Sequence, residues 1–236
     1  MNDIILGDCL EEMRKIQMSS VDMILTDLPY GTTQNKWDSI IDLREMWNLF
    51  HHVSKETTPI VLTSAQPFTS NLVMSNPKEF KYEWIWEKEK GTGFLNAKKQ
   101  PLRSHESILI FYKKQCVYNP QMETGTKYKK TTNEATRSDN YGSQISITHN
   151  NDGVRHPKTV LKIPRDNANR NSLHPTAKPV KLFEYLVKTY TNEGDLVLDC
   201  TAGSGTTGVA CKNLNRNYIL IEKEQKYYEI IKERLK

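Results

Sequence analysis

The chain has 236 residues, enough for one α/β domain with an insertion and too few for two large independent domains. Hydrophobic residues make up 37% and charged residues 26% of it, with a net charge of +5, a composition typical of globular rather than disordered or collagen-like proteins. No apolar run approaches the roughly 18 residues of a membrane span and no secretory signal stands at the N-terminus, so we expect no membrane attachment.

The first half of the chain alternates short apolar runs with stretches of helical periodicity. We expect strands at residues 4–6, 21–25 and 59–63, and helices at about 10–16, at 39–53 and from Pro67 onward. Two more strands are expected at 82–86 and 108–112. The segment between them is expected to be a polar loop that contains Gly91, Gly93, Lys98, Lys99 and His105.

The periodicity fades between residues 115 and 173 and returns after them. The expected elements there are a helix at 179–190, a strand at 196–199, a glycine-rich turn at 201–208 leading into a helix, a strand at 218–221 and a charged C-terminal helix. Strands that alternate with helices predict an α/β fold with a doubly wound, mostly parallel sheet. We therefore divide one domain into a first half at 1–114, an inserted segment at 115–173 and a second half at 174–236.

Four cysteines, Cys9, Cys116, Cys200 and Cys211, lie far apart in the sequence. They form no Cys-x-x-Cys pair and no regular ladder with histidines, so the spacing suggests neither a disulfide framework nor a zinc site. We expect a cytoplasmic protein that binds no metal.

The first candidate site is the turn that follows the expected strand at 196–199. Its sequence is DCTAGSGTTG, in which Gly203, Gly205 and Gly208 fit the Gly-x-Gly-x-x-Gly pattern of dinucleotide-binding turns. Glycines at this place let a ligand approach the unpaired amides of a helix N-terminus, although a turn that only packs strand against helix fits as well. The next strand ends at Glu222, where a carboxylate can accept hydrogen bonds from two ribose hydroxyls.

The second candidate site is the segment TDLPYG at residues 26–31, directly after the expected strand at 21–25. The carboxyl ends of parallel strands line the ligand crevice of an open α/β sheet, so an acid, a proline and an aromatic ring together at such an end indicate a functional site. Taken alone, the segment is equally compatible with an ordinary turn. The glycine-rich turn elsewhere in the chain favours the functional interpretation.

Together the two motifs resemble those of the S-adenosylmethionine-dependent DNA amino-methyltransferases, which carry Asp-Pro-Pro-Tyr and Asp-Pro-Phe-x-Gly-Ser-Gly-Thr. The resemblance spans nearly the whole chain. The catalytic motif at 27–30 comes first, the basic segment next and the cofactor motif at 199–207 last, an order similar to the β-class of this family. Lys178-Pro179 and His105-Glu106 match the family as well. The resemblance implies a Rossmann-like methyltransferase fold with an inserted basic target-recognition segment.

The chain departs from the family pattern at three positions. Leu28 replaces the first proline of the catalytic motif, and Cys200 and Thr201 replace Pro and Phe in the cofactor motif. Leu28 still supplies a backbone carbonyl, and Pro29 still favours an extended conformation before it. Because Thr201 removes an aromatic ring from beside the cofactor, we expect this departure to affect cofactor affinity more than catalysis.

The resemblance implies transfer of a methyl group from S-adenosylmethionine to the exocyclic N6 of an adenine flipped out of the duplex. That amine is a poor nucleophile because its lone pair is delocalised, and the Asp27 carboxylate with the Leu28 carbonyl would accept its hydrogen bonds. Pro29 would stiffen the segment and Tyr30 would stack on the flipped base. An Asp-led motif favours adenine in this family, and cytosine N4 stays open as the alternative.

The resemblance also implies a set of cofactor-binding residues. Asp199 and the glycine-rich turn would shape the methionine pocket, Glu222 would hold the ribose and Asp8 would lie near the adenine. Lys178 would flank the methionine end, although a surface ion pair is an equal alternative for Asp8 and Lys178. The full expected set is Asp8, Cys9, Lys178, Asp199, Thr201, Gly203, Ser204, Gly205, Thr206 and Glu222.

Residues 112–170 hold the whole positive excess of the chain. Eleven lysines and arginines stand there against five acids, which leaves the rest of the sequence slightly negative. Such a concentration, with tyrosines interspersed, favours a nucleic-acid-binding surface over a solvated loop. We expect this segment to contact double-stranded DNA through Lys127, Lys129, Lys130, Arg137, Arg155, Arg165 and Arg170.

Two other functional classes stay open at this point. A nicotinamide-dependent oxidoreductase would use the glycine-rich turn but leaves the 26–31 segment and the basic segment without a role. A DNA-binding module without activity would conflict with the intact Asp27 and Tyr30. The resemblance is compatible with a homodimer and with a partner restriction endonuclease, but these and the recognition sequence cannot be read from one chain.

Overall fold

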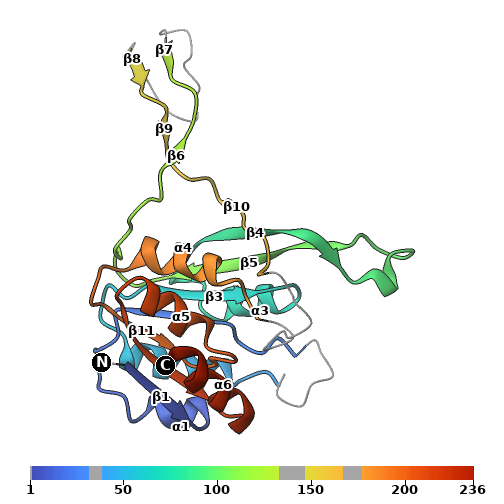
Figure 1. Cartoon of the computed structure of the whole chain (residues 1–236), viewed down its shortest axis with the longest axis vertical. Coiled ribbons are helices and arrows are strands. Elements are labelled where there is room, and N and C mark those ends of the chain that lie inside the picture. The colour runs from blue at the N-terminus through green and yellow to red at the C-terminus, as the bar shows by residue number, and fades with distance from the viewer. Residues whose placement is uncertain (1, 32–38, 133–146, 167–176) are drawn as a thin grey trace. The chain divides into compact units, whose positions relative to one another are not determined.

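The computed structural model describes residues 2–31, 39–132, 147–166 and 177–236. Eight strands form its main sheet: β1 (Asn2–Leu6), β2 (Met23–Thr26), β3 (Ile60–Ser64), β4 (Phe80–Thr92), β5 (Arg103–Phe111), β10 (Val160–Lys162), β11 (Leu196–Asp199) and β12 (Asn217–Glu222). Their order across the sheet is β1-β12-β11-β2-β3-β5-β4-β10 (Figure 1). The predicted doubly wound arrangement is therefore present.

Most neighbouring strands of this sheet are parallel. β1, β12, β11, β2 and β3 run in one direction, β5 runs antiparallel to both of its neighbours, and β10 is parallel to β4. From β11 the chain continues to β12 on one side, whereas from β2 it continues to β3 on the other. The strand order thus reverses between β11 and β2, which is where α/β sheets of this kind bind ligands.

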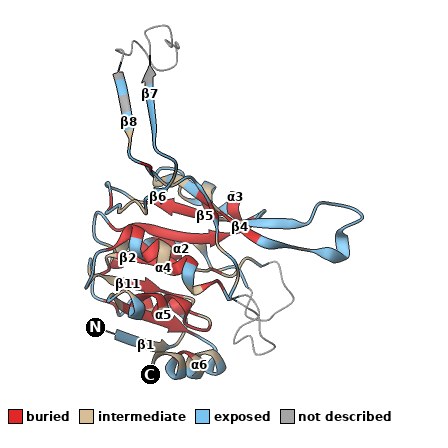
Figure 2. Cartoon of the chain, turned by 45° about the horizontal axis from the view of Figure 1, so that its top comes forward, coloured by how far each residue is buried: buried red, intermediate tan, exposed pale blue. Residues whose placement is uncertain are grey.

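Helices cover both faces of the sheet (Figure 1). On one face lie α1 (Cys9–Met13), α2 (Leu43–Val53) and α3 (Phe68–Ser75), and on the other α4 (Val180–Tyr190), α5 (Thr206–Asn213) and α6 (Gln225–Leu235). Ile24 and Leu198 pack under the first group, and their neighbours Leu25 and Val197 under the second. Because both sides are covered, the central strands β2, β3 and β11 are mostly apolar up to their carboxyl ends and almost wholly buried (Figure 2).

Two helices are shorter than the periodicity predicts. The helix expected at about 10–16 ends at Met13, and the helix expected at 39–53 begins only at Leu43. Each begins after an aspartate cap: an Asp8 side-chain oxygen accepts a hydrogen bond from the Leu10 amide at 2.9 Å, and Asp42 does the same for the Glu45 amide at 3.0 Å. The caps, rather than the apolar spacing, define where these helices start.

The polar loop expected between residues 86 and 108 is mostly strand, so that prediction is wrong. β4 and β5 remain paired through Glu87 with His105 and Thr92 with Arg103, and the connection shrinks to residues 93–102 with a short 3₁₀ helix at Phe94–Asn96. The charged and glycine residues of this run have low strand propensity. Cross-strand pairing on the established root of the hairpin outweighs that propensity.

Residues 120–158 form a second compact unit within the basic segment. In it β6 (Glu123–Thr124) pairs with β9 (Val154–Arg155), and β7 (Tyr128–Thr132) pairs with β8 (Ile147–Asn151), both antiparallel. The periodicity fades there, and the described side chains of β6, β7 and β9 are exposed, so these strands need no apolar face. Elsewhere in the described residues, all four cysteines are free and buried, and no helix is long and apolar enough to cross a membrane.

The Tyr190 hydroxyl connects α4 to β4, and we expect its removal to destabilise the fold. It accepts a hydrogen bond from the Trp84 indole nitrogen at 2.7 Å and shares another with the Tyr82 hydroxyl at 3.0 Å. Tyr190→Phe leaves a buried indole N–H without its partner, so we expect the free energy of unfolding to fall by about 1–3 kcal/mol. Urea denaturation should show a lower midpoint with an unchanged slope. The exposed Tyr128→Phe is the control, expected within about 0.5 kcal/mol of wild type.

Candidate functional site

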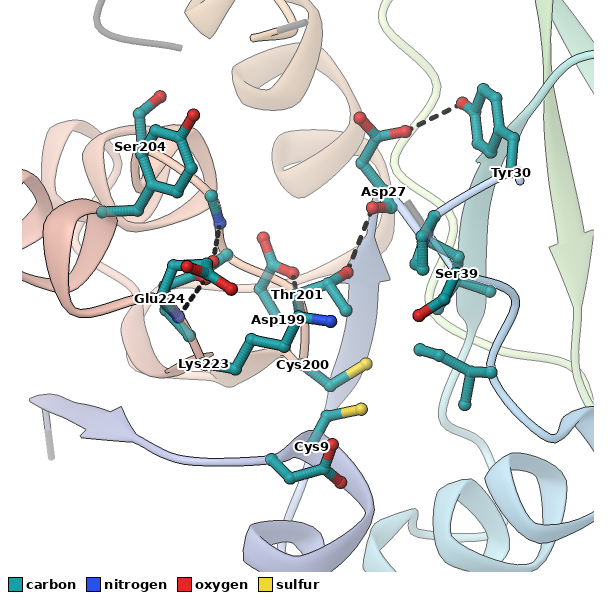
Figure 3. Close-up of a pocket in the computed structure, with 18 of the residues that line it drawn as sticks. Cys9, Asp27, Tyr30, Ser39, Asp199, Cys200, Thr201, Ser204, Lys223 and Glu224 are labelled. Atoms are coloured by element: carbon teal, nitrogen blue, oxygen red, sulfur yellow. Dashed lines mark hydrogen bonds between the residues drawn. The ribbon is translucent and has the colours of Figure 1, made fainter. Parts of the chain in front are cut away.

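A cavity of about 370 Å³ opens at the edge where β2, β11 and β12 end (Figure 3). Its volume lies in the range of about 300–1,000 Å³ that small-molecule sites occupy. All four expected catalytic residues line it, as do all the expected cofactor residues except Gly205. The two motifs and the first strand end therefore meet in one hollow, as their positions after parallel strands predict.

Hydrogen bonds between threonines and aspartates join the two motifs. The Thr26 hydroxyl donates to Asp199 Oδ1 at 2.7 Å. The Thr201 hydroxyl donates to the Asp27 carbonyl oxygen at 3.0 Å (Figure 3). The two hydroxyls also lie 2.7 Å apart. Thr201, which stands where the family pattern has an aromatic ring, thus holds the backbone of the catalytic segment against the cofactor turn.

Asp199 organises the start of the glycine-rich turn. Its carboxylate, which is buried, accepts hydrogen bonds from the Thr26 hydroxyl, from the Thr201 amide at 3.1 Å and from the Thr207 hydroxyl. Burial raises the pKa of Asp199 to about 6, although these three donors oppose the shift. The geometry supports a role in shaping the turn, whose first helical residue is Thr206.

Glu222 and two left-handed glycines shape the other side of the turn. Gly203 and Gly205 have φ angles of 54° and 81°, and a Cβ on Gly205 would meet Ile231 at 3.1 Å. Glu222 Oε2 accepts from the Gly203 amide and its Oε1 from the Glu224 amide, each at 2.8 Å. Burial raises the pKa of Glu222. The Lys223 backbone also donates to Glu222, so of the roughly four acceptor positions of the carboxylate about one remains for a ribose hydroxyl.

Three side chains orient the Asp27 carboxylate. Oδ1 accepts from the Tyr30 hydroxyl at 2.8 Å and from the Thr63 hydroxyl, and Oδ2 accepts from Lys178 Nζ at 2.5 Å. The Tyr30 ring packs against Phe68 with centroids 5.5 Å apart and planes at 28°. Burial, with the nearby Asp27 charge, raises the pKa of Tyr30 well above its usual value, so its hydroxyl remains a donor at neutral pH.

Lys178 is buried, which excludes the surface ion pair as an interpretation. Besides Asp27, it contacts Glu106 Oε2 at 3.4 Å, while Glu106 Oε1 pairs with Lys88 Nζ at 2.8 Å. Burial lowers the pKa of Lys178, but the carboxylates of Asp27 and Glu106 outweigh it and raise that pKa above the usual value. The result is a chain of alternating charges from the catalytic motif to the root of the β4–β5 hairpin.

Sequence reasoning missed several side chains of this site. Thr63 lies near the carboxyl end of β3, and Lys223 and Glu224 follow β12 and line the cavity. The rule that carboxyl ends of parallel strands face the crevice would have indicated all three. Cys9 and Cys200 point their sulfur atoms toward each other at the cavity (Figure 3), and no pattern in the sequence predicts that pair.

The residues expected to contact DNA are dispersed. Lys127, Lys129, Lys130 and Arg155 are exposed in the 120–158 unit, where the Arg155 guanidinium lies 5.7 Å from the centre of the Tyr128 ring. Arg165 belongs to the larger unit and pairs with Glu89 at 3.5 Å. Arg137 and Arg170 lie outside the described residues. Within the part of the chain that the structure describes, no group of three or more metal-binding side chains gathers.

Asp199 predicts a pH dependence of stability. The pKa of Asp199 is about 6 in the folded protein, whereas an ordinary aspartate, as in the unfolded chain, has a pKa of 3.8. Between these two pH values the folded protein therefore binds more protons than the unfolded chain. This contribution to stability is complete below about pH 4 and is lost as the pH rises through about 6. We expect Asp199→Asn to remove that loss, measured as urea midpoints at pH 4.5 and 7 relative to wild type. If the urea midpoints of Asp199→Asn and wild type changed equally with pH, Asp199 would not be the group responsible. Asp3→Asn, at an exposed position, is the control and should respond to pH as wild type does.

The sequence matches a protein-family model over residues 21–233, the DNA methylase family of N6 and N4 type. It is 30% identical to the DNA adenine methyltransferase YhdJ of Escherichia coli (strain K12), with 96% of this chain and 80% of that protein covered. It is also 27% identical to the Type II methyltransferase M.HpaI of Haemophilus parainfluenzae, with 98% of this chain and 73% of that protein covered.

Solved structures agree on the fold. The crystal structure of the M1.HpyAVI–SAM complex matches with a TM-score of 0.68 at 24% identity, with both chains fully covered. The PvuII DNA methyltransferase, titled cytosine-N4-specific, matches with a TM-score of 0.73 at 16% identity, covering 100% of this chain and 87% of that one. The predicted fold and family resemblance are confirmed, and family membership replaces the nicotinamide alternative. The chain belongs to the N6/N4 DNA methylase family and is an S-adenosylmethionine-dependent DNA amino-methyltransferase.

Proposed function

We propose that this enzyme methylates the exocyclic N6 of adenine in a base flipped out of double-stranded DNA. The observation that carries the proposal is an aspartate, Asp27, at the head of the catalytic motif, held by three donors at the edge of the shared cavity. The similarity to a relative named as a DNA adenine methyltransferase supports the same base. Cytosine N4 is the competing target, because an enzyme titled cytosine-N4-specific has the same fold.

The catalytic segment acts by accepting hydrogen bonds from the target amine. Tyr30, Thr63 and Lys178 occupy three of the roughly four acceptor positions of the Asp27 carboxylate, which leaves one for an amine hydrogen. The Leu28 carbonyl accepts the second hydrogen. Since the three donors already fix the carboxylate, no reorientation is needed as positive charge develops on the nitrogen.

Tyr30 provides the surface on which the flipped base stacks. Its ring packs against Phe68 and is fixed by its hydroxyl at Asp27 and Thr63, and Lys178 Nζ lies over the ring, 5.5 Å from its centre. Pro29 lines the same cavity between the two acceptors and the ring. Stacking here offsets part of the few kcal/mol lost when the base leaves the duplex.

The remaining cavity residues fit S-adenosylmethionine, which supplies an electrophilic methyl group when bound. Glu222, held by three backbone amides, keeps about one acceptor position for a ribose hydroxyl, and Asp8 and Cys9 border the side expected for the adenine. The glycine-rich turn, with Ser204 and Thr206 in the cavity wall, holds the methionine part. Lys178 lies between this region and Asp27, so its amine is placed to serve the methionine end as well as the catalytic carboxylate.

The base assignment is tested by analysing the nucleosides of duplex DNA incubated with the enzyme and labelled cofactor. We expect N6-methyladenine, and N4-methylcytosine as the labelled product would overturn the proposal. In Asp27→Ala, methyl incorporation should fall by at least about 100-fold, because an acceptor of the target amine is lost. Cofactor affinity, measured by calorimetry, should stay within a few fold. Unchanged incorporation in this variant would remove Asp27 from the mechanism.

We also propose that the 120–158 unit contacts DNA through its exposed cations. Substitution of these cations tests this second part of the function. Replacing Lys127, Lys129 and Lys130 by Gln should weaken duplex binding and lower the slope of log affinity against log salt by about 2–3, since each lost phosphate contact accounts for about 0.9. Replacing the exposed Lys226, Lys232 and Lys236 of the C-terminal region by Gln is the matched control. Equal slopes in the two triple variants would contradict the DNA-binding role.

A partner restriction endonuclease fits the type II names of several relatives and stays a proposal.

A further inference from the structure

The β4–β5 hairpin extends far past the edge of the sheet that carries the cavity. β4 has 13 residues, whereas β2 has 4 and β3 has 5. The pairing places Thr26 level with Leu62, Leu109 and Glu83, so residues 84–92 lie beyond the level at which β2 ends. Because β4 runs in the same direction as β2, the extension lies on the side of Asp27. At about 3.3 Å per residue it reaches roughly 25–30 Å.

The outer part of this hairpin is basic and apolar. Residues 90–103 contain four cations, Lys90, Lys98, Lys99 and Arg103, and no acid. At the apex, Phe94 and Leu95 are 77% and 86% exposed, and the outer part of the hairpin is coloured as exposed in Figure 2. A single exposed apolar side chain is ordinary, but an adjacent pair at the end of a long ribbon, surrounded by cations alone, indicates a contact surface.

The root of the hairpin is firmly attached to the catalytic site. Trp86 is buried, and its neighbour Lys88 is 7% exposed and pairs with Glu106, which in turn contacts Lys178 beside Asp27. The pairing of β5 with β3 and of β4 with β10 holds the root in the sheet, and its charges reach the lysine that contacts Asp27. A polyanion bound in front of the cavity would lie within its reach.

We propose that the β4–β5 hairpin is a DNA-binding arm, additional to the 120–158 unit, that lies in the major groove of the substrate duplex. That groove is about 12 Å wide and admits a two-stranded β-ribbon. Lys90, Lys98, Lys99 and Arg103 bind the flanking phosphates, and Phe94 with Leu95 contacts the apolar base edges in the groove. The inference rests on the DNA substrate of the family and not on the choice of adenine.

The charges favour DNA over a second copy of this chain as the occupant of the arm. Two hairpins meeting at their tips would bring together eight cations without an acid from residues 90–103 on either side. Like charges at an interface are unfavourable, whereas phosphates complement all four positions. An oligomer formed through the tip is accordingly one of the outcomes that the experiment separates.

The test measures equilibrium binding of a duplex oligonucleotide by fluorescence anisotropy, a readout that does not depend on which base is methylated. In Phe94→Ala/Leu95→Ala we expect about tenfold weaker binding, since two apolar contacts are lost. In Lys98→Gln/Lys99→Gln we expect the salt slope to fall by about 2. Both changes lie on exposed residues, so urea midpoints should match wild type, and cofactor affinity should not change.

Matched controls carry the same chemistry elsewhere on the surface. Met18→Ala/Met74→Ala removes two side chains that are 66% and 72% exposed, and Lys226→Gln/Lys232→Gln removes two exposed cations. Duplex affinity and salt slope equal to those of these controls would overturn the proposal. So would a loss of self-association in sedimentation with duplex binding unchanged, which would assign the tip to a second copy of the chain.

Discussion

The parallel pairing of β2 with β11 is the constraint on which the site depends. It places Thr26 beside Asp199, 173 residues away in the sequence, and lets the hydroxyls of Thr26 and Thr201 tie the two motifs together. Because the chain winds away from this pair in both directions, the two strand ends open onto one crevice. The proposed acceptors for the amine and the proposed cofactor turn are therefore positioned by the same few hydrogen bonds.

The departures from the family motifs make sense against this constraint. Thr201 donates a hydrogen bond to the Asp27 backbone, so the position that lost a ring gained a link to the catalytic segment. Leu28 is 2% exposed and packs into the core on the α1–α3 side, which fixes the segment by burial where the family pattern has a proline. Both replacements substitute one means of holding the backbone for another.

The sequence predicts the parts of this structure that depend on local patterns. Apolar runs identify the central strands because both faces are covered, and strand ends identify Asp27, Asp199 and Glu222 as neighbours. Three features are not local. The pairing that lengthens β4 and β5 comes from their partners. The four charges from Asp27 to Lys88 lie on four separate segments of the chain. In β6, β7 and β9 the described side chains are exposed and leave no apolar pattern. Such features require the fold before they can be recognised.

The place of the two proposed DNA-binding elements along the chain follows from the order of the motifs. Both the hairpin and the 120–158 unit lie between the catalytic strand β2 and the cofactor strand β11, and the chain returns through β10 beside β4 at the outer edge of the sheet. Lengthening either element therefore leaves the β2–β11 contact untouched. A duplex-binding surface can vary in length and charge while the two proposed acceptors stay fixed. Two links join the root of the hairpin to Asp27: the Lys88–Glu106–Lys178 chain of charges, and the pairing of β5 with β3, whose Thr63 donates a hydrogen bond to Asp27. A change of charge at the root of the proposed arm therefore bears on the same lysine that orients the Asp27 carboxylate.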